Sequence, residues 1–170
     1  MRTLAAAVTV VVLAGLAIVV WDALDEPDVA TSPAGIGVVR SIIDGDTIDI
    51  TIDGTDERIR LLGIDTPETK IPDVPVECFG PEAAARTSEL LPVGTQVRLE
   101  RDIVGRDDYG RMLAYVHRLD DDLFVNETLV REGFARLLFI RPNFAYRGQM
   151  VDAATAAERE GLGLWGACGG

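Results

Sequence analysis

Hydrophobic residues follow two different periods along this chain, and these periods predict strands in some segments and helices in others. Residues 48–52 alternate isoleucine with polar residues, which is the two-residue period of a half-buried strand. The Asp53-Gly54 pair predicts a turn, and residues 58–62 are typical of the returning strand. The pattern therefore predicts a β-hairpin in this part of the chain.

Further strands and three helices are predicted beyond the hairpin. Apolar, β-branched segments predict strands over 38–43, 96–101 and 112–119. Helices are predicted from Pro81 onward, over 125–132, and along the apolar stripe of 146–157. Residues 137–140 form an apolar run that predicts a buried segment. Five strands with helices after the third and at the end predict a small closed barrel capped by helices, an α+β fold.

The first 21 residues predict a membrane-associated segment. Leu4 to Trp21 is an uncharged stretch that as a helix would reach about 27 Å, close to the thickness of a bilayer core. An uncleaved signal anchor is favoured because no clear cleavage site follows Trp21, although a cleaved secretory signal and a buried helix are alternatives. Arg2 before the stretch favours a cytoplasmic N-terminus and export of the rest.

The remaining residues divide into an acidic linker and one domain. Residues 22–34 are acidic, contain two prolines and lack a hydrophobic period, which predicts a tether to a domain over 35–170. The formal net charge is −12, which by itself argues against a polyanionic partner. Lys70 is the only lysine, so the other basic residues are arginines, the better side chain for gripping phosphate. Local charge, rather than net charge, decides binding.

Two acidic clusters stand at the ends of neighbouring predicted strands. The first is the string Asp44-Gly45-Asp46-Thr47, and the second is Asp65-Thr66-Pro67-Glu68, five residues after Arg60. Carboxylates brought together repel one another unless a cation or a proton intervenes, and oxygen ligands on loops suit Ca²⁺. Zinc is disfavoured because the chain has a single histidine, His117. The clusters therefore predict a calcium site.

A polar turn over 107–111 adds an arginine to this picture. If Arg60 and Arg111 converge on a phosphate held at the metal, they supply the cations that phosphoryl transfer needs. A carboxylate beside the metal, such as that of Glu68, could accept the proton of the attacking water. An alternative is that Arg111 is only a solvated residue at a strand edge.

Four strings resemble, in order and spacing, the signatures of staphylococcal-nuclease-like enzymes, the thermonuclease family. They are VVRSIIDGDTI, RIRLLGIDTPETK, DYGRMLAYV and VNETLVREG, and the resemblance extends from about residue 37 to residue 165. It implies an OB-fold, which is a five-stranded barrel with three helices. It also implies a Ca²⁺-dependent endonuclease that cleaves phosphodiester bonds of DNA or RNA and acts as a monomer without an obligate protein partner.

The resemblance also implies a calcium-binding set in this sequence. Calcium would be held by the carboxylates of Asp46 and Asp65 and by the backbone carbonyl of Thr66. Asp44 would stand in the outer shell of the ion.

The same resemblance implies three catalytic residues and one nucleotide-binding residue. Glu68 would position or deprotonate the attacking water, and Arg60 and Arg111 would grip the scissile phosphate. Tyr109 would line the nucleotide pocket. This chain departs from the best-studied members further on, where their nucleotide-contacting tyrosines are replaced by, among others, Phe139 and Arg141, and Asp108 stands in place of a lysine.

Two cysteines and one rival function complete the expectations. Cys78 and Cys168 on an exported chain favour a single disulfide, and two free thiols are the alternative.

The rival function is a non-catalytic OB-fold module that binds nucleic acid or protein. Catalysis is favoured because this chain keeps the acidic and arginine positions that inactive repeats of the family have lost.

Overall fold

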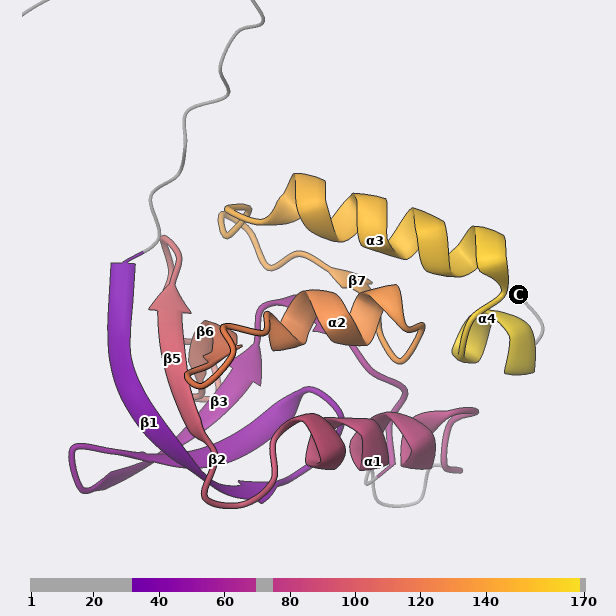
Figure 1. The fold of residues 1–170 in the computed structure, drawn as a ribbon. Helices are drawn as coiled ribbons and strands as arrows, with labels where there is room; N and C mark the ends of the chain where they lie inside the picture. Colours follow the sequence, from indigo (N-terminus) through magenta and orange to yellow (C-terminus); the bar gives the residue numbers. More distant parts are fainter. Residues whose placement is uncertain (1–31, 70–74, 169–170) are drawn as a thin grey trace, which may run out of the picture.

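Five strands close into a barrel in this computed structural model, which describes residues 32–69 and 75–168 (Figure 1). Around the barrel the strand order is β1, β2, β3, β6, β5, and only the β3–β6 pair is parallel. The bounds are Ser32–Ile42 for β1, Thr47–Ile52 for β2, Thr55–Leu61 for β3, Gln96–Arg101 for β5 and Met112–Arg118 for β6. The predicted barrel is therefore confirmed, and it fits the OB-like fold.

Alternation along the strands fills the barrel. Ile48, Ile50 and Ile59 are fully buried, whereas the polar residues between them, such as Asp49, lie on the outer face. Because side chains of neighbouring positions on a strand point to opposite faces, the outer face of β2 and β3 is free to carry charged groups. The functional side chains described below use this face and the loops at its edge.

The described residues also form three helices of more than one turn and one short helix, of which the first two contact strands of the barrel and the third packs mainly on the second. They are α1 (Gly80–Leu90), α2 (Val125–Arg131), α3 (Arg147–Glu160) and α4 (Leu164–Ala167). In Figure 1, α2 lies between α1 and α3. Asn126 ties α2 to the barrel, since its amide group donates to the carbonyl of Leu62 and accepts from the N–H of Val116, both at 2.9 Å. Arg86 of α1 adds two hydrogen bonds to Glu132 at the end of α2.

A second, two-stranded sheet was absent from the predicted elements. Strand β4 (Gly63–Asp65) pairs antiparallel with β7 (Arg136–Leu138). The prediction of a buried run over 137–140 is wrong, because Leu138 is 43% exposed and the other three residues are only partly buried. The cause is that β7 pairs only with the three residues of β4, so much of its surface stays open.

The barrel domain begins earlier than the predicted boundary at residue 35. Strand β1 starts at Ser32 and pairs with β5 from that residue onward. Pro33 does not prevent this pairing, because the register of β1 shifts between Pro33 and Gly35. The predicted hydrophobic segment and most of the predicted linker lie outside the described residues. Over residues 32–69 and 75–168, no helix is long and apolar enough to cross a membrane.

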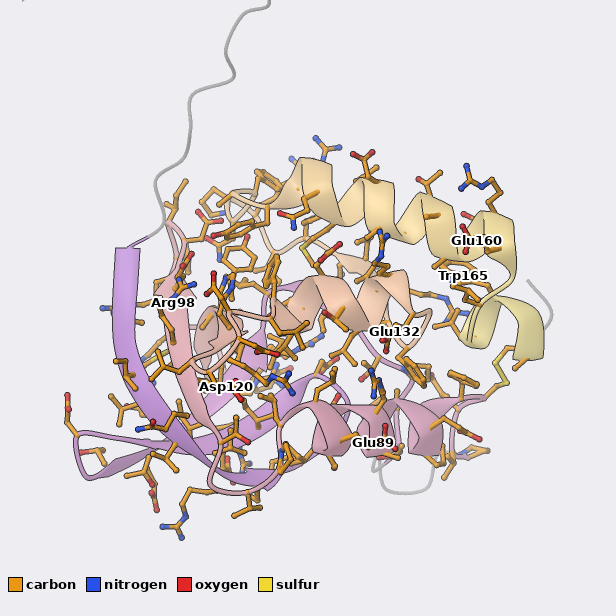
Figure 2. The ribbon with its side chains drawn as sticks, in the orientation of Figure 1. Glu89, Arg98, Asp120, Glu132, Glu160 and Trp165 are labelled. Carbon is orange, nitrogen blue, oxygen red and sulfur yellow. A yellow bond between two sulfur atoms is a disulfide. The ribbon has the colours of Figure 1, made fainter. Side chains whose placement is uncertain are left out.

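A disulfide links the C-terminal helix to the loop before α1. Cys78 and Cys168 are bonded, with Cα atoms 5.8 Å apart, which confirms the predicted pairing (Figure 2). The bond closes a loop with a sequence separation of 90 residues. A loop of this length removes enough entropy from the unfolded chain to stabilise the fold by about 4 kcal/mol. It also anchors the chain next to Glu77, a residue that contacts Glu68 in the candidate site.

Candidate active site

The turn between β1 and β2 presents two aspartates at one edge of the barrel. Asp44 caps this turn, because its Oδ1 accepts the backbone N–H of Asp46 at 3.2 Å. Gly45 is required between them, since a Cβ there would lie 2.7 Å from side-chain atoms of Thr66. Thr87 of α1 donates its hydroxyl to the carbonyl of Gly45 at 2.6 Å. Helix α1 therefore holds this turn against the loop that follows β4.

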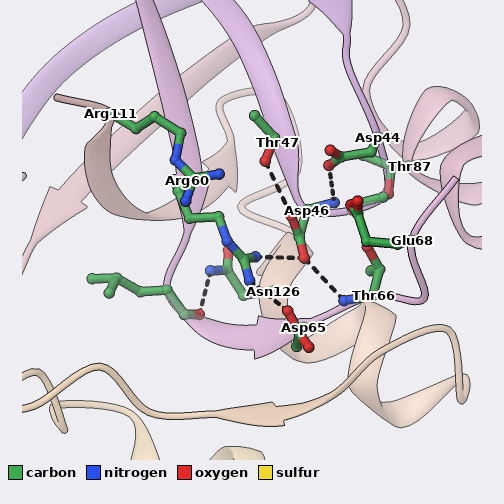
Figure 3. A network of polar contacts seen from close by, with 12 residues as sticks. Asp44, Asp46, Thr47, Arg60, Asp65, Thr66, Glu68, Thr87, Arg111 and Asn126 are labelled. Carbon is green, nitrogen blue, oxygen red and sulfur yellow. Dashed lines mark hydrogen bonds and ion pairs between the residues drawn. The ribbon is translucent and has the colours of Figure 1, made fainter. Parts of the chain in front are cut away.

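Arg60 joins the two acidic clusters through a network of charged side chains. Its Nη1 lies 2.5 Å from Oδ2 of Asp46, and its Nη2 donates to Oδ1 of Asp65 at 2.7 Å (Figure 3). The backbone N–H of Thr66 donates to the same oxygen of Asp46 at 2.9 Å. Asp44, Asp46, Arg60, Asp65 and Thr66 are called the Asp46 network below. Sequence spacing predicted that these residues meet, and the structure brings them together.

The network differs in exposure from one end to the other. The side chains of Asp46 and Arg60 are almost fully buried, whereas that of Asp65 is 55% exposed. Nη1 of Arg60 is buried against Oδ2 of Asp46, in a close ion pair that departs from ideal hydrogen-bond geometry. The guanidinium group of Arg60 therefore faces a buried carboxylate at one end and the exposed carboxylate of Asp65 at the other.

Two carboxyl groups of the site, those of Asp46 and Glu68, have pKa values above their ordinary values. Burial raises the pKa of Asp46 to about 6, even though Arg60 and the Thr66 N–H favour the charged form. Burial, and after it nearby negative charge, also raises the pKa of Glu68 above its ordinary value. The carboxylates responsible are those of Asp44, Glu77 and Asp65. This crowding of negative charge is the condition that a bound cation relieves.

Glu68 is held in place through its backbone. Its N–H donates to Oε2 of Glu77 at 3.1 Å, and the N–H of Glu77 donates back to the Glu68 carbonyl at 3.0 Å. Glu77 precedes Cys78, so the disulfide fixes the segment that supports Glu68. The sequence analysis did not identify Glu77, because nothing in its local pattern shows that the loop folds back on itself.

Arg111 is oriented by an aspartate that the sequence analysis placed only in a polar turn. Asp107 accepts hydrogen bonds from Nε of Arg111 at 2.6 Å and from its backbone N–H at 2.9 Å. The guanidinium group lies 5.5 Å from the ring centre of Tyr109, which is 86% exposed. Figure 3 draws no contact between Arg111 and the Asp46 network. The convergence of Arg60 and Arg111 on one phosphate stays a prediction.

The acidic residues have the chemistry of a calcium site but not its finished geometry. Among residues 32–69 and 75–168, no three acidic, histidine or cysteine side chains are gathered closely enough to hold a metal ion. The reason is that Asp46 and Asp65 both turn toward Arg60. The available donors are nevertheless hard oxygens, which fit Ca²⁺. His117 lies elsewhere, stacked on Phe124 with ring centroids 4.6 Å apart.

The fold and this site together define a class: a small barrel protein with carboxylates and arginines gathered at one barrel edge, suited to binding a phosphate group. The model of the family described as "Staphylococcal nuclease homologue" matches residues 58–167. The chain is 46% identical over 128 residues to a thermonuclease of Staphylococcus intermedius, covering 75% of this chain and 74% of that protein. It is 43% identical to a thermonuclease of Staphylococcus hyicus, with 75% and 73% covered.

A relative from another genus agrees with these matches. Endonuclease YncB of Bacillus subtilis (strain 168) is 40% identical over 129 residues, which are 75% of this chain and 60% of that protein. The chain belongs to the staphylococcal nuclease family. It is an enzyme, a nuclease that hydrolyses phosphodiester bonds. The rival expectation of a non-catalytic binding module is therefore not supported.

Proposed function

We propose that this nuclease is Ca²⁺-dependent and cleaves DNA or RNA by attack of a water molecule on the phosphate. The observation that supports the proposal is the Asp46 network, in which the buried carboxyl group of Asp46 has a raised pKa and Arg60 bridges it to the exposed carboxylate of Asp65. Asp46 and Asp65 would ligate the ion through their carboxylates, and Thr66 through its backbone carbonyl, with Asp44 behind them. When bound, Ca²⁺ would polarise a phosphate oxygen as a Lewis acid.

The chain's own residues supply the remaining chemistry. Glu68 would take the proton of the attacking water, a role that its raised pKa favours at neutral pH. Arg60 and Arg111 would donate to the phosphate oxygens where negative charge develops. For Arg60 this requires that a cation draw Asp46 and Asp65 away from it, or that the phosphate displace these carboxylates, which hold Arg60 in the free protein. Tyr109 would contact the nucleotide beside Arg111.

Calcium dependence is tested by metal removal. Digestion of single-stranded DNA is expected with Ca²⁺ and is expected to stop on chelation, because the donors are oxygens that need a hard cation to bring them together. Zn²⁺ is not expected to replace Ca²⁺, because the site offers no sulfur or imidazole ligand. Restoring Ca²⁺ after chelation is the control for protein integrity. Full activity in excess chelator would contradict the metal assignment.

We also propose that the enzyme acts outside the cytoplasm, as a monomer. Support for the location comes from the uncharged stretch from Leu4 to Trp21 and from the Cys78–Cys168 disulfide, since such bonds persist in oxidising compartments. Support for the monomer is that one chain supplies every residue of the Asp46 network.

The location is tested in whole cells that produce the full chain. Protease added to intact cells is expected to digest the barrel domain, and the membrane fraction is expected to retain the chain if the segment stays uncleaved. A cytoplasmic protein serves as the control for cell lysis. A barrel domain that is degraded only after lysis would contradict an extracytoplasmic location.

A further inference from the structure

A cavity of about 820 Å³ lies on the outer face of the barrel. The lining residues that matter here come from three strands and one turn. They are Arg40 and Ser41 of β1, Asp49 of β2, Arg58 of β3, and Tyr109 with Arg111 in the turn before β6. Only Tyr109 and Arg111 belong to the proposed catalytic and nucleotide contacts, so the Arg40–Arg58 side has no role in the function argued so far.

The strands place this cavity next to the scissile-phosphate position. Arg58 and Arg60 lie two residues apart on β3 and so share its outer face, while Ile59 between them points into the core. Strand β3 pairs in parallel with β6, with Arg60 opposite Leu113. The same register extended by two residues sets Arg58 opposite Arg111. A ligand that touches Arg60 and Arg111 therefore needs only a short extension to reach Arg58.

The negative charges at the cavity are already partnered by arginines. Asp49 accepts from Nε and Nη2 of Arg58 at 2.8 and 3.1 Å. Glu57 is held in the same bidentate way by Arg106, and Asp56 lies 3.7 Å from Arg40. The chain has a formal net charge of −12, but the carboxylates at this cavity are each paired with an arginine. A nucleic-acid strand that approaches the cavity is therefore repelled less than elsewhere on the surface.

The cavity also has the groups that hold a nucleic-acid strand. The side chains of Arg40 and Arg58 are 60% and 51% exposed, so they can reach phosphates without first being uncovered. The ring of Tyr109 is an exposed platform beside Arg111, and single-stranded binders combine such rings with arginines along the backbone. The volume lies within the range of sites for small ligands, which suits one or two nucleotides.

We propose that this cavity, here named the strand cavity and lined by Arg40, Ser41, Asp49, Arg58, Tyr109 and Arg111, binds the single-stranded polynucleotide next to the cleaved phosphate. Arg40 and Arg58 bind backbone phosphates, and Tyr109 stacks on an unpaired base. A duplex is disfavoured because its bases are already stacked and cannot be offered to Tyr109. The proposal rests on the proposed nuclease function and specifies how its substrate is held.

The test compares a long and a short substrate in the full chain. For Arg58→Gln, kcat/KM on a single-stranded oligonucleotide is expected to fall about tenfold, mainly through KM, because one bidentate phosphate contact is lost. Cleavage of the p-nitrophenyl ester of thymidine 5′-phosphate is expected to be unchanged, because this substrate is too short to reach Arg58. Arg159→Gln is the matched control, since Arg159 is exposed and paired with a carboxylate but lies on α3.

A second variant reverses the direction of the effect. Asp49→Asn releases Arg58 from its partner, so the KM for the oligonucleotide is expected to decrease. Oligonucleotide binding by Arg58→Gln is expected to lose about one unit of slope in a plot of log affinity against log salt, which loss of one phosphate contact predicts and a packing defect does not.

Two results would overturn the strand cavity. One is an equal loss on the long and the short substrate in an Arg58→Gln protein whose unfolding transition matches that of the unmodified protein, and the other is an unchanged salt slope. Failure of the underlying nuclease function is distinguishable, because the unmodified protein would then cleave neither substrate. A variant that loses its fold would lose activity on the short substrate as well, and Asp49→Asn would still decide the question.

Discussion

Glu68→Gln is expected to lower kcat by about 10²- to 10⁴-fold while oligonucleotide binding persists, because loss of a general base has effects of this size. Glutamine keeps the size of the side chain but cannot accept the proton of water. The backbone of Glu68 is held by Glu77, and the substitution leaves those two hydrogen bonds intact. The loss is therefore expected in the chemical step and not in the position of the loop.

The measurement is single-turnover cleavage of single-stranded DNA, together with binding of the same DNA at equal calcium concentration. Glu82→Gln is the matched control. Glu82 is an exposed glutamate in the first turn of α1, and its substitution changes the net charge by the same amount as Glu68→Gln. Equal loss of binding and turnover in Glu68→Gln would make Glu68 a structural or metal-binding residue instead of the base.

Arg111→Lys is expected to lower kcat by about 10²-fold, because a planar guanidinium that binds developing charge is replaced by a point charge. Asp107 fixes Arg111 through its Nε and its backbone N–H. Lysine has no Nε donor, so Asp107 would draw its ammonium group away from the phosphate. The same change of residue at Arg159 on α3 is expected to leave kcat unaltered.

The measurement is kcat and KM on single-stranded DNA at saturating calcium. A fall in kcat with little change in KM would identify a contact made in the transition state. Asp107→Asn is an independent test of the same role. It is expected to disturb the orientation of Arg111 and to lower kcat by a smaller factor than Arg111→Lys does. Rates like those of the unmodified protein in Arg111→Lys would remove this arginine from the site.

The barrel could be predicted from local patterns because burial on one face of a strand imposes a two-residue period. The segment from Ile48 to Ile52 shows this directly, and both Ile48 and Ile50 are fully buried. The β4–β7 sheet could not be predicted in this way. Each of its strands has three residues, too few to establish a period, and their pairing joins positions that are far apart in the sequence.

The acidic clusters show the same division at the level of the site. The strings around Asp46 and Asp65 predicted that these carboxylates meet, since both leave neighbouring strands of one hairpin. The sequence did not indicate that Arg60 would hold both of them in the free protein. Ion-pair partners depend on distances of a few ångströms in space, and spacing along the chain does not specify those distances.

By itself, the sequence determined the strand alternation, the order of the elements, the motifs that resemble a nuclease family and the identity of the two cysteines. These features are local, because each depends on residues within a few positions of one another. Only the tertiary structure decided that Glu77 supports Glu68, that Asp107 orients Arg111, and that Arg58 faces a cavity beside the site. Those relationships arise when the barrel closes and loops fold back, and chain folding of this kind leaves no period in the sequence.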